Sequence, residues 1–324
     1  MPRVEVRPGG QSFLVEGADS ILEAALGSGL AMPYGCSSGV CGECKARVVS
    51  GSVERIRHHD FAFTAAERLQ GYALMCCTTA LTDVTVEAVL AHEAADIPRQ
   101  SVSAHVRRVE NLSDHVMLLE LTTPRTERLR FLAGQGAVVT LGGVSATLPI
   151  ASCPCEERRL HFHLRRDAGD ALSAYVFDRV RVGEAAVIDG PVGDFTLRED
   201  GARPLVFIAW GWQGFAPVKS VIEHALAQES ASSIDLMWIA ADAAGHYQPK
   251  LCRSWAAAMD EFRFSPIVTE ARPYDALAQA LAGLDPLPVR DFYVAGGADE
   301  VAATRAFLIE SKLPPSQLVT WTPH

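Results

Sequence analysis

Eight cysteines occur in this 324-residue sequence, and three of them fall within nine residues. Cys36, Cys41 and Cys44 share one glycine-rich segment, and Cys76 follows 32 positions after Cys44. Thiolates ligate zinc and iron–sulfur clusters, whereas structural disulfides are rare in chains kept in a reducing compartment. The grouping therefore indicates a metal centre.

The spacing narrows the choice of metal. C-x4-C-x2-C with a distant fourth cysteine is the plant-type [2Fe–2S] pattern, whereas zinc, the alternative, usually takes paired C-x2-C units. We predict a [2Fe–2S] cluster held by Cys36, Cys41, Cys44 and Cys76. The neighbouring Cys77 is the other candidate for the fourth ligand, but Cys76 matches the pattern better. Gly35, Gly39 and Gly42 would let the loop turn sharply and present N–H groups to the sulfurs.

Composition excludes some functions. The 29 Lys and Arg against 39 Asp and Glu give a net charge of −10, which argues against nucleic-acid binding. No apolar run approaches the roughly 18 residues of a membrane-spanning helix, and the first residues lack the apolar core of a signal peptide. We therefore expect a cytoplasmic protein without a transmembrane segment.

Three blocks along the chain are expected to position the chemistry. Residues 1–95 begin with strand-like runs and a helix with a capping box at Ser20 and Glu23, as expected for a β-grasp ferredoxin domain. Residues 100–198 contain short strands separated by glycine turns, which predicts an antiparallel β-barrel. Residues 203–324 start with the apolar run 205–209, followed by alternating helices and strands, which predicts a doubly wound α/β domain.

The order of these blocks resembles the single-chain ferredoxin–NAD(P)H reductases that serve bacterial ring-hydroxylating dioxygenases and soluble monooxygenases. The resemblance covers the whole chain. It includes an F-x-x-G-Q strand at 131–135, a G-P-x-G-x-F turn at 190–195 and a G-x-A-P helix start at 214–217. It implies hydride transfer from NAD(P)H to FAD, then single-electron transfer through the cluster to a protein acceptor, an oxygenase component.

The resemblance also implies cofactor-binding residues. FAD would be held by the backbone of the segment equivalent to the family's flavin motif, by a turn that opens a helix, and by an aromatic ring near the C-terminus. The nicotinamide nucleotide would meet the first loop of the α/β domain. These positions are Leu148, Pro149, Ile150, Ala151, Ser152, Gly169, Ser173, Gly211, Gly214, Pro217 and Trp321. Ordinary core packing is the alternative role for Trp321.

Three departures from the family motifs affect these sites. The stretch equivalent to the flavin motif R-x-Y-S is 146–152, Ala-Thr-Leu-Pro-Ile-Ala-Ser, which contains no Arg or Tyr. Two lost charge-assisted hydrogen bonds would weaken FAD binding by about 10²–10⁴-fold. Arg165 or Arg166 could replace the lost pyrophosphate contact. The G-G-T-G loop has become 210–214 with two tryptophans, and Asp242 stands where the family carries a phosphate-binding G-A-R triplet. The alternative function is therefore a non-catalytic redox-relay or scaffold subunit that has lost FAD or NAD(P)H binding.

Two further groups of residues could form chemical sites. Cys153-Pro154-Cys155 could be a redox or metal pair, or two small residues beside a barrel turn. His161 and His163 alternate on one strand and so share a face, either as a metal pair or as ordinary strand residues.

Overall fold

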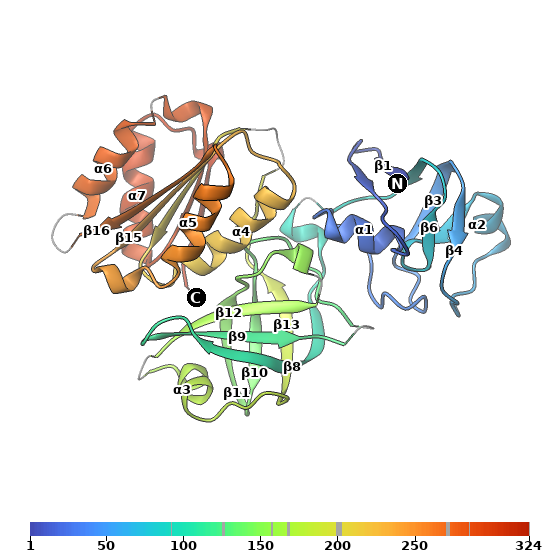
Figure 1. The fold of residues 1–324 in the computed structure, drawn as a ribbon, viewed down its shortest axis with the longest axis horizontal. Coiled ribbons are helices and arrows are strands. Elements are labelled where there is room, and N and C mark those ends of the chain that lie inside the picture. Colours follow the sequence, from blue (N-terminus) through green and yellow to red (C-terminus); the bar gives the residue numbers. More distant parts are fainter. Residues whose placement is uncertain are drawn as a thin grey trace.

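Three units built on separate sheets follow one another in the computed structural model, which describes residues 1–91, 93–124, 127–156, 158–166, 169–198, 203–269, 273–284 and 286–323. Figure 1 shows the N-terminal unit set to one side, with the middle unit below the C-terminal one. Among these residues, no helix is long and apolar enough to cross a membrane.

The N-terminal unit contains a five-stranded mixed sheet of order β2-β1-β7-β3-β5 and a separate β4-β6 pair. Helix α1 buries Ile21, Leu22 and Ala25 against this sheet. The predicted capping box is confirmed, because Glu23 N donates to Ser20 Oγ over 3.2 Å and Ser20 N donates to Glu23 Oε2 over 3.0 Å. The elements are β1 (Arg3–Arg7), β2 (Ser12–Leu14), α1 (Ile21–Gly27), β3 (Lys45–Ser50), β4 (Val53–Arg55), α2 (Ala65–Leu69), β5 (Tyr72–Leu74), the 3-10 turn η1 (Met75–Cys77), β6 (Thr78–Ala80) and β7 (Val84–Glu87).

The middle unit is an antiparallel sheet of order β11-β10-β13-β8-β9-β12, curled into a half-barrel, which confirms the predicted class. Alternate residues face its core, as the burial pattern of β8 shows. The sequence did not identify the edge strand β11, which pairs with β10 from Gly136↔Pro149 to Leu141↔Val144. The elements are β8 (Gln100–Asn111), β9 (Val116–Thr122), β10 (Gly136–Leu141), β11 (Val144–Pro149), η3 (Pro154–Glu156), β12 (Arg159–Arg165), α3 (Ala171–Asp178) and β13 (Ala185–Val192).

The C-terminal unit is a parallel sheet of order β16-β15-β14-β17-β18 with helices on both faces. Alternate residues of β14 enter opposite cores: Phe207 joins the cluster of α4 and α5, and Ile208 joins that of α6 and α7. Burial on both faces explains the unbroken apolar run in the sequence. The elements are β14 (Leu205–Trp210), α4 (Phe215–Ala227), β15 (Ile234–Ala240), η4 (Ala243–Gly245), α5 (Pro249–Ala258), β16 (Phe262–Val268), α6 (Pro273–Ala282), η5 (Leu287–Val289), β17 (Asp291–Ala295), α7 (Ala298–Glu310), η6 (Pro315–Gln317) and β18 (Leu318–Trp321).

Residues joining the first two units pack against the barrel. The 3-10 turn η2 (Ala94–Asp96) lies in this segment, and Ala91 and Ile97 form a small buried cluster with Leu132. The N-terminal unit also contacts the C-terminal end of α4. Gln228, the residue that caps this helix, donates its Nε2–H to Gly29 O over 2.7 Å. The N-terminal unit therefore contacts both the middle unit and the C-terminal unit.

Candidate functional site

The first two predicted cluster cysteines lie in a loop whose backbone N–H groups point at sulfur. Cys36 Sγ accepts N–H groups from Ser38, Val40 and Cys41 at 3.3–3.4 Å. Cys41 Sγ accepts the N–H groups of Cys36 at 3.3 Å and Glu43 at 3.4 Å. Such donors stabilise negative charge on a ligating sulfur.

Hydrogen bonding makes Cys36 the more acidic thiol of this loop. Burial by itself would raise its pKa, but the Ser38 side chain and the surrounding N–H groups outweigh burial and lower the pKa to about 6. At Cys41 burial dominates and raises the pKa despite the two N–H donors. A thiolate is therefore favoured at Cys36 even before a metal binds.

The other two predicted ligands are already adjacent to each other. Cys44 Sγ lies 3.2 Å from Cys76 Sγ, and both residues are buried. Two sulfurs this close can share one iron of a two-iron cluster. Their proximity brings together residues from the loop and from η1, as the [2Fe–2S] hypothesis requires.

The environment distinguishes Cys76 from Cys77. Hydrogen bonding from Cys44, together with that from Cys77 and the Gly39 N–H, lowers the pKa of Cys76 to about 7 against the opposing effect of burial. Burial and the adjacent Cys76 charge raise the pKa of Cys77 to about 12. These shifts support Cys76 as the thiolate ligand.

Glycine is sterically required within the loop. Gly39 has φ +83°, and a Cβ there would lie 2.5 Å from His59 Cβ and 2.8 Å from Cys77 Sγ. Gly42 has φ +78°, and a Cβ there would lie 2.1 Å from the Phe61 ring. Within the described part of the chain, no group of three or more His, Cys, Asp or Glu side chains converges on a single metal ion. The loop instead offers paired sulfurs and inward N–H groups, which fit a two-iron cluster.

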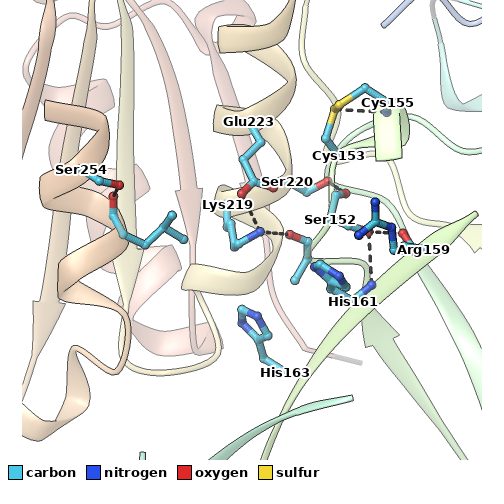
Figure 2. A network of polar contacts seen from close by, with 12 residues as sticks. Ser152, Cys153, Cys155, Arg159, His161, His163, Lys219, Ser220, Glu223 and Ser254 are labelled. Atoms are coloured by element: carbon cyan, nitrogen blue, oxygen red, sulfur yellow. Dashed lines mark hydrogen bonds and ion pairs between the residues drawn. A yellow bond between two sulfur atoms is a disulfide. The ribbon is translucent and has the colours of Figure 1, made fainter. Parts of the chain in front are cut away.

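The strand end assigned to flavin is occupied by protein contacts. Ile150, Ala151 and Ser152 are fully buried. Lys219 Nζ donates to Ala151 O over 2.9 Å, and Ser220 Oγ donates to Ser152 O over 2.7 Å (Figure 2). Ala151 and Ser152 therefore join the barrel to α4.

The part of this segment that corresponds to R-x-Y-S is likewise apolar and packed. Leu148 is 8% exposed and belongs to the barrel core together with Leu172 of α3, and Pro149 offers no N–H. Neither Arg165 nor Arg166 is buried, and Arg166 pairs with Asp178 over 3.3 Å. The residues present do not supply the flavin contacts of the family motif.

The predicted pyrophosphate turn is present, but a carboxylate covers it. Gly169 is exposed, and Asp170 Oδ1 accepts the N–H groups of Leu172 over 3.0 Å and Ser173 over 3.2 Å at the start of α3. Ser173 is buried, and its hydroxyl donates to Arg165 O. Because a helix N-terminus binds phosphate through such N–H groups, Asp170 competes with a pyrophosphate for them.

The first loop of the α/β unit lies between β14 and α4. Gly211 has φ +61°, and a Cβ on Gly214 would lie 2.2 Å from Ala295 O. Pro217 is buried within the first turn of α4. Trp210 points away into the protein, where its indole Nε1 donates to Thr304 Oγ1 over 3.0 Å. Gly211 is thus explained by its positive φ and Gly214 by close packing, and the Trp210 indole does not occupy the loop.

The remaining predicted ring, Trp321, packs against the α/β core. It is half-buried in the cluster that includes Phe215, and its carbonyl accepts Gly296 N over 3.2 Å. This agrees with the packing role considered for it. His161 and His163 differ in their surroundings: His163 is buried and hydrogen-bonds Tyr247 Oη over 2.9 Å, and burial lowers the pKa of both imidazoles.

Sequence reasoning missed a buried ion pair at the junction of the barrel and α4. Lys219 Nζ lies 2.7 Å from Glu223 Oε1, one helical turn along, and Lys219 is 5% exposed. Burial raises the pKa of Glu223, and the Lys219 charge opposes that shift. The sequence signal for this ion pair was the spacing of four residues between Lys219 and Glu223 on a largely apolar helix.

The pair considered at Cys153 and Cys155 is present as a disulfide, with Cα atoms 5.1 Å apart. The bond belongs to η3, beside the Ser152 segment and α4 (Figure 2). The two cysteines therefore do more than fill space beside a turn, because they are covalently bonded to each other.

Comparisons with known proteins bear on both the cluster and the whole chain. Residues 4–81 match the model of the 2Fe-2S iron-sulfur cluster binding domain. The chain is 29% identical over 267 residues to CDP-6-deoxy-L-threo-D-glycero-4-hexulose-3-dehydrase reductase of Yersinia pestis, covering 82% of this chain and 79% of that protein. It is 31% identical over 277 residues to the phenol 2-monooxygenase reductase component DmpP of Pseudomonas sp. (strain CF600), covering 83% of this chain and 76% of that protein. Among solved structures it is similar to the Amycolatopsis cytochrome P450 reductase GcoB, with 25% identity, a TM-score of 0.63, and coverage of 99% and 98% of the two chains.

Proposed function

Because this chain belongs to the family of ferredoxin-containing reductase components of oxygenase systems, we propose that it passes electrons from a reduced nicotinamide to a partner oxygenase. This function requires a [2Fe–2S] cluster and FAD, and the described residues lack the flavin contacts of the family motif. When bound, FAD accepts a hydride and releases electrons singly, and the cluster carries one electron at a time.

The cysteine loop is the observation that carries this function. We propose Cys36, Cys41, Cys44 and Cys76 as the cluster ligands. The five N–H donors aimed at Cys36 and Cys41 and the 3.2 Å approach of Cys44 to Cys76 support this assignment. These donors would stabilise the added negative charge of the reduced cluster.

We propose that FAD and the nicotinamide nucleotide contact the positions that correspond to the family motifs. The expected FAD affinity is low, because an apolar strand and the Asp170 carboxylate replace the motif's charged contacts. We propose a ferredoxin domain over 1–95, a flavin-type barrel over 100–198 and a nicotinamide-type domain over 203–324. We also propose a cytoplasmic location, where thiols stay reduced until the cluster binds.

One experiment tests the proposed function. Protein purified under anaerobic conditions should contain two irons per chain, and FAD should be found in the supernatant after acid precipitation. NADH or NADPH should then bleach the visible spectrum. Protein that holds no flavin after reconstitution, and that neither nucleotide reduces, would instead support the relay or scaffold function.

A further inference from the structure

The Cys153–Cys155 disulfide lies where the three units meet. Its 3-10 turn η3 contacts both α1 of the ferredoxin-like unit and α4 of the α/β unit. Pro154 and His224 line a narrow cavity together with Tyr34, which precedes the cluster cysteine Cys36 by two residues. The disulfide thus lies in the contact between the units, outside the proposed ligand set.

The two sulfurs of this disulfide have unequal access. Cys153 is 2% exposed, and its Sγ lies 3.8 Å from His224 Nδ1, inside the protein. Cys155 is only half-buried and lines an open surface cavity of about 610 Å³. A thiolate arriving from solvent therefore meets Cys155 first.

The described lining of this cavity is rich in arginine although the whole chain is acidic. Besides Cys155 it is lined by Arg107, Arg158, Arg159, Glu156 and Thr122. Arg107 is paired with Glu120 over 2.9 Å, and Arg159 makes only a 3.9 Å contact with Glu156. Among the described residues that line the cavity and their partners, the three arginines outnumber Glu120 and Glu156, an arrangement that favours an anionic reactant at Cys155.

We propose that Cys153 and Cys155 form a redox-active pair that exchanges with a small anionic thiol entering the arginine-lined cavity. A disulfide that is exposed on one side is the kind that cycles in a compartment where structural disulfides are rare. The motif adds a second redox site, distinct from the cluster and the flavin.

The exchange balances with the thiol as the only co-reactant. Its thiolate attacks Cys155 Sγ, a mixed disulfide forms at Cys155, the Cys153–Cys155 bond breaks, and Cys153 leaves as a thiolate that takes up a proton. A second thiolate attacks the sulfur of the first thiol in that mixed disulfide, releasing the oxidised thiol and freeing Cys155. Two thiols are oxidised, and one protein disulfide becomes a dithiol.

The test follows the tryptic peptide spanning residues 131–158, which contains these two cysteines and no others. Native protein is equilibrated with glutathione mixtures, quenched with an alkylating reagent and digested. The peptide is expected to change from the disulfide, two hydrogens lighter than the dithiol, to a doubly alkylated form, and to revert in oxidised glutathione. At equal thiolate concentration, glutathione should react at least about fivefold faster than the cationic thiol cysteamine.

Variants assign the two sulfurs. With oxidised glutathione, Cys153→Ser should accumulate an adduct on Cys155, while Cys155→Ser should give at most about a tenth as much on Cys153, because that sulfur is buried. Arg158→Ala should reduce the preference for glutathione, and Cys252→Ser, which removes a fully buried free thiol, should behave as the unaltered protein.

Two results would overturn the proposal. The first is that Cys153 and Cys155 are doubly alkylated in every glutathione mixture, so that no disulfide forms. The second is that their disulfide persists in millimolar reduced glutathione, which would make it structural. Both readouts use wild-type protein, so misfolding of a variant does not affect them. Iron content and nicotinamide-dependent bleaching are recorded separately, so that failure of the electron-transfer function is distinguishable from failure of this exchange.

Discussion

Replacing Gly39 by alanine tests whether the cluster loop depends on close packing. Gly39 has φ +83°, and its backbone N–H donates a hydrogen bond to Cys76. A methyl group there would approach His59 Cα to 3.1 Å and Cys77 Sγ to 2.8 Å. The loop would have to shift, and with it the N–H groups that face the sulfurs.

The expected loss of stability in Gly39→Ala is the sum of two separate free-energy costs. A left-handed conformation costs a non-glycine residue about 1–2 kcal/mol. Overpacking against a fixed neighbour adds about 1–3 kcal/mol. Gly10 has φ +76°, and a methyl there would meet no atom within 4 Å, so Gly10→Ala should show the first term without the second.

Urea unfolding of both variants, combined with iron analysis, measures the difference. We expect Gly39→Ala to lose about 2–5 kcal/mol of stability and most of its iron. We expect Gly10→Ala to lose about 1–2 kcal/mol and to keep its iron. Equal stability and equal iron content in the two variants would refute the packing argument for this loop.

Three further outcomes are expected. Cys76→Ala should abolish the visible spectrum of the cluster, whereas Cys77→Ala should retain it; the reverse result would make Cys77 the fourth ligand. Asp170→Asn keeps a helix cap but removes a negative charge, so FAD titrated into flavin-free protein should bind about tenfold more tightly, and unchanged affinity would place the pyrophosphate elsewhere. Burial lowers the pKa of His224 to about 4 from an ordinary value near 6.5, so its neutral form stabilises the fold above that ordinary value. That stabilisation of about 3 kcal/mol is lost as the pH falls from 6.5 towards 4, and in denaturant titrations across this range His224→Gln should show a correspondingly shallower loss.

Much of the fold was predictable because its signals are local. The capping box at Ser20 and Glu23 depends on a spacing of three residues, and it was found as predicted. The run 205–209 is apolar because both sides of its strand are buried, and it does form the central parallel strand. Strand β11 was missed although Gly142 and Gly143 form a turn directly before it and apolar residues alternate along it, so the local signals of a hairpin were present in the sequence.

By itself the sequence determined that three cysteines of a glycine-rich loop and a fourth 32 positions later have cluster spacing, ahead of a barrel and an α/β unit. Only the tertiary structure decided what surrounds them. Lys219 reaches Ala151 across 68 positions, Asp170 covers the helix terminus offered to a phosphate, and Cys153 is buried while its partner Cys155 faces an arginine-lined cavity. Spacing specifies which residues can act together along one loop, whereas burial and charge at a site are set by elements that the fold brings from distant parts of the chain.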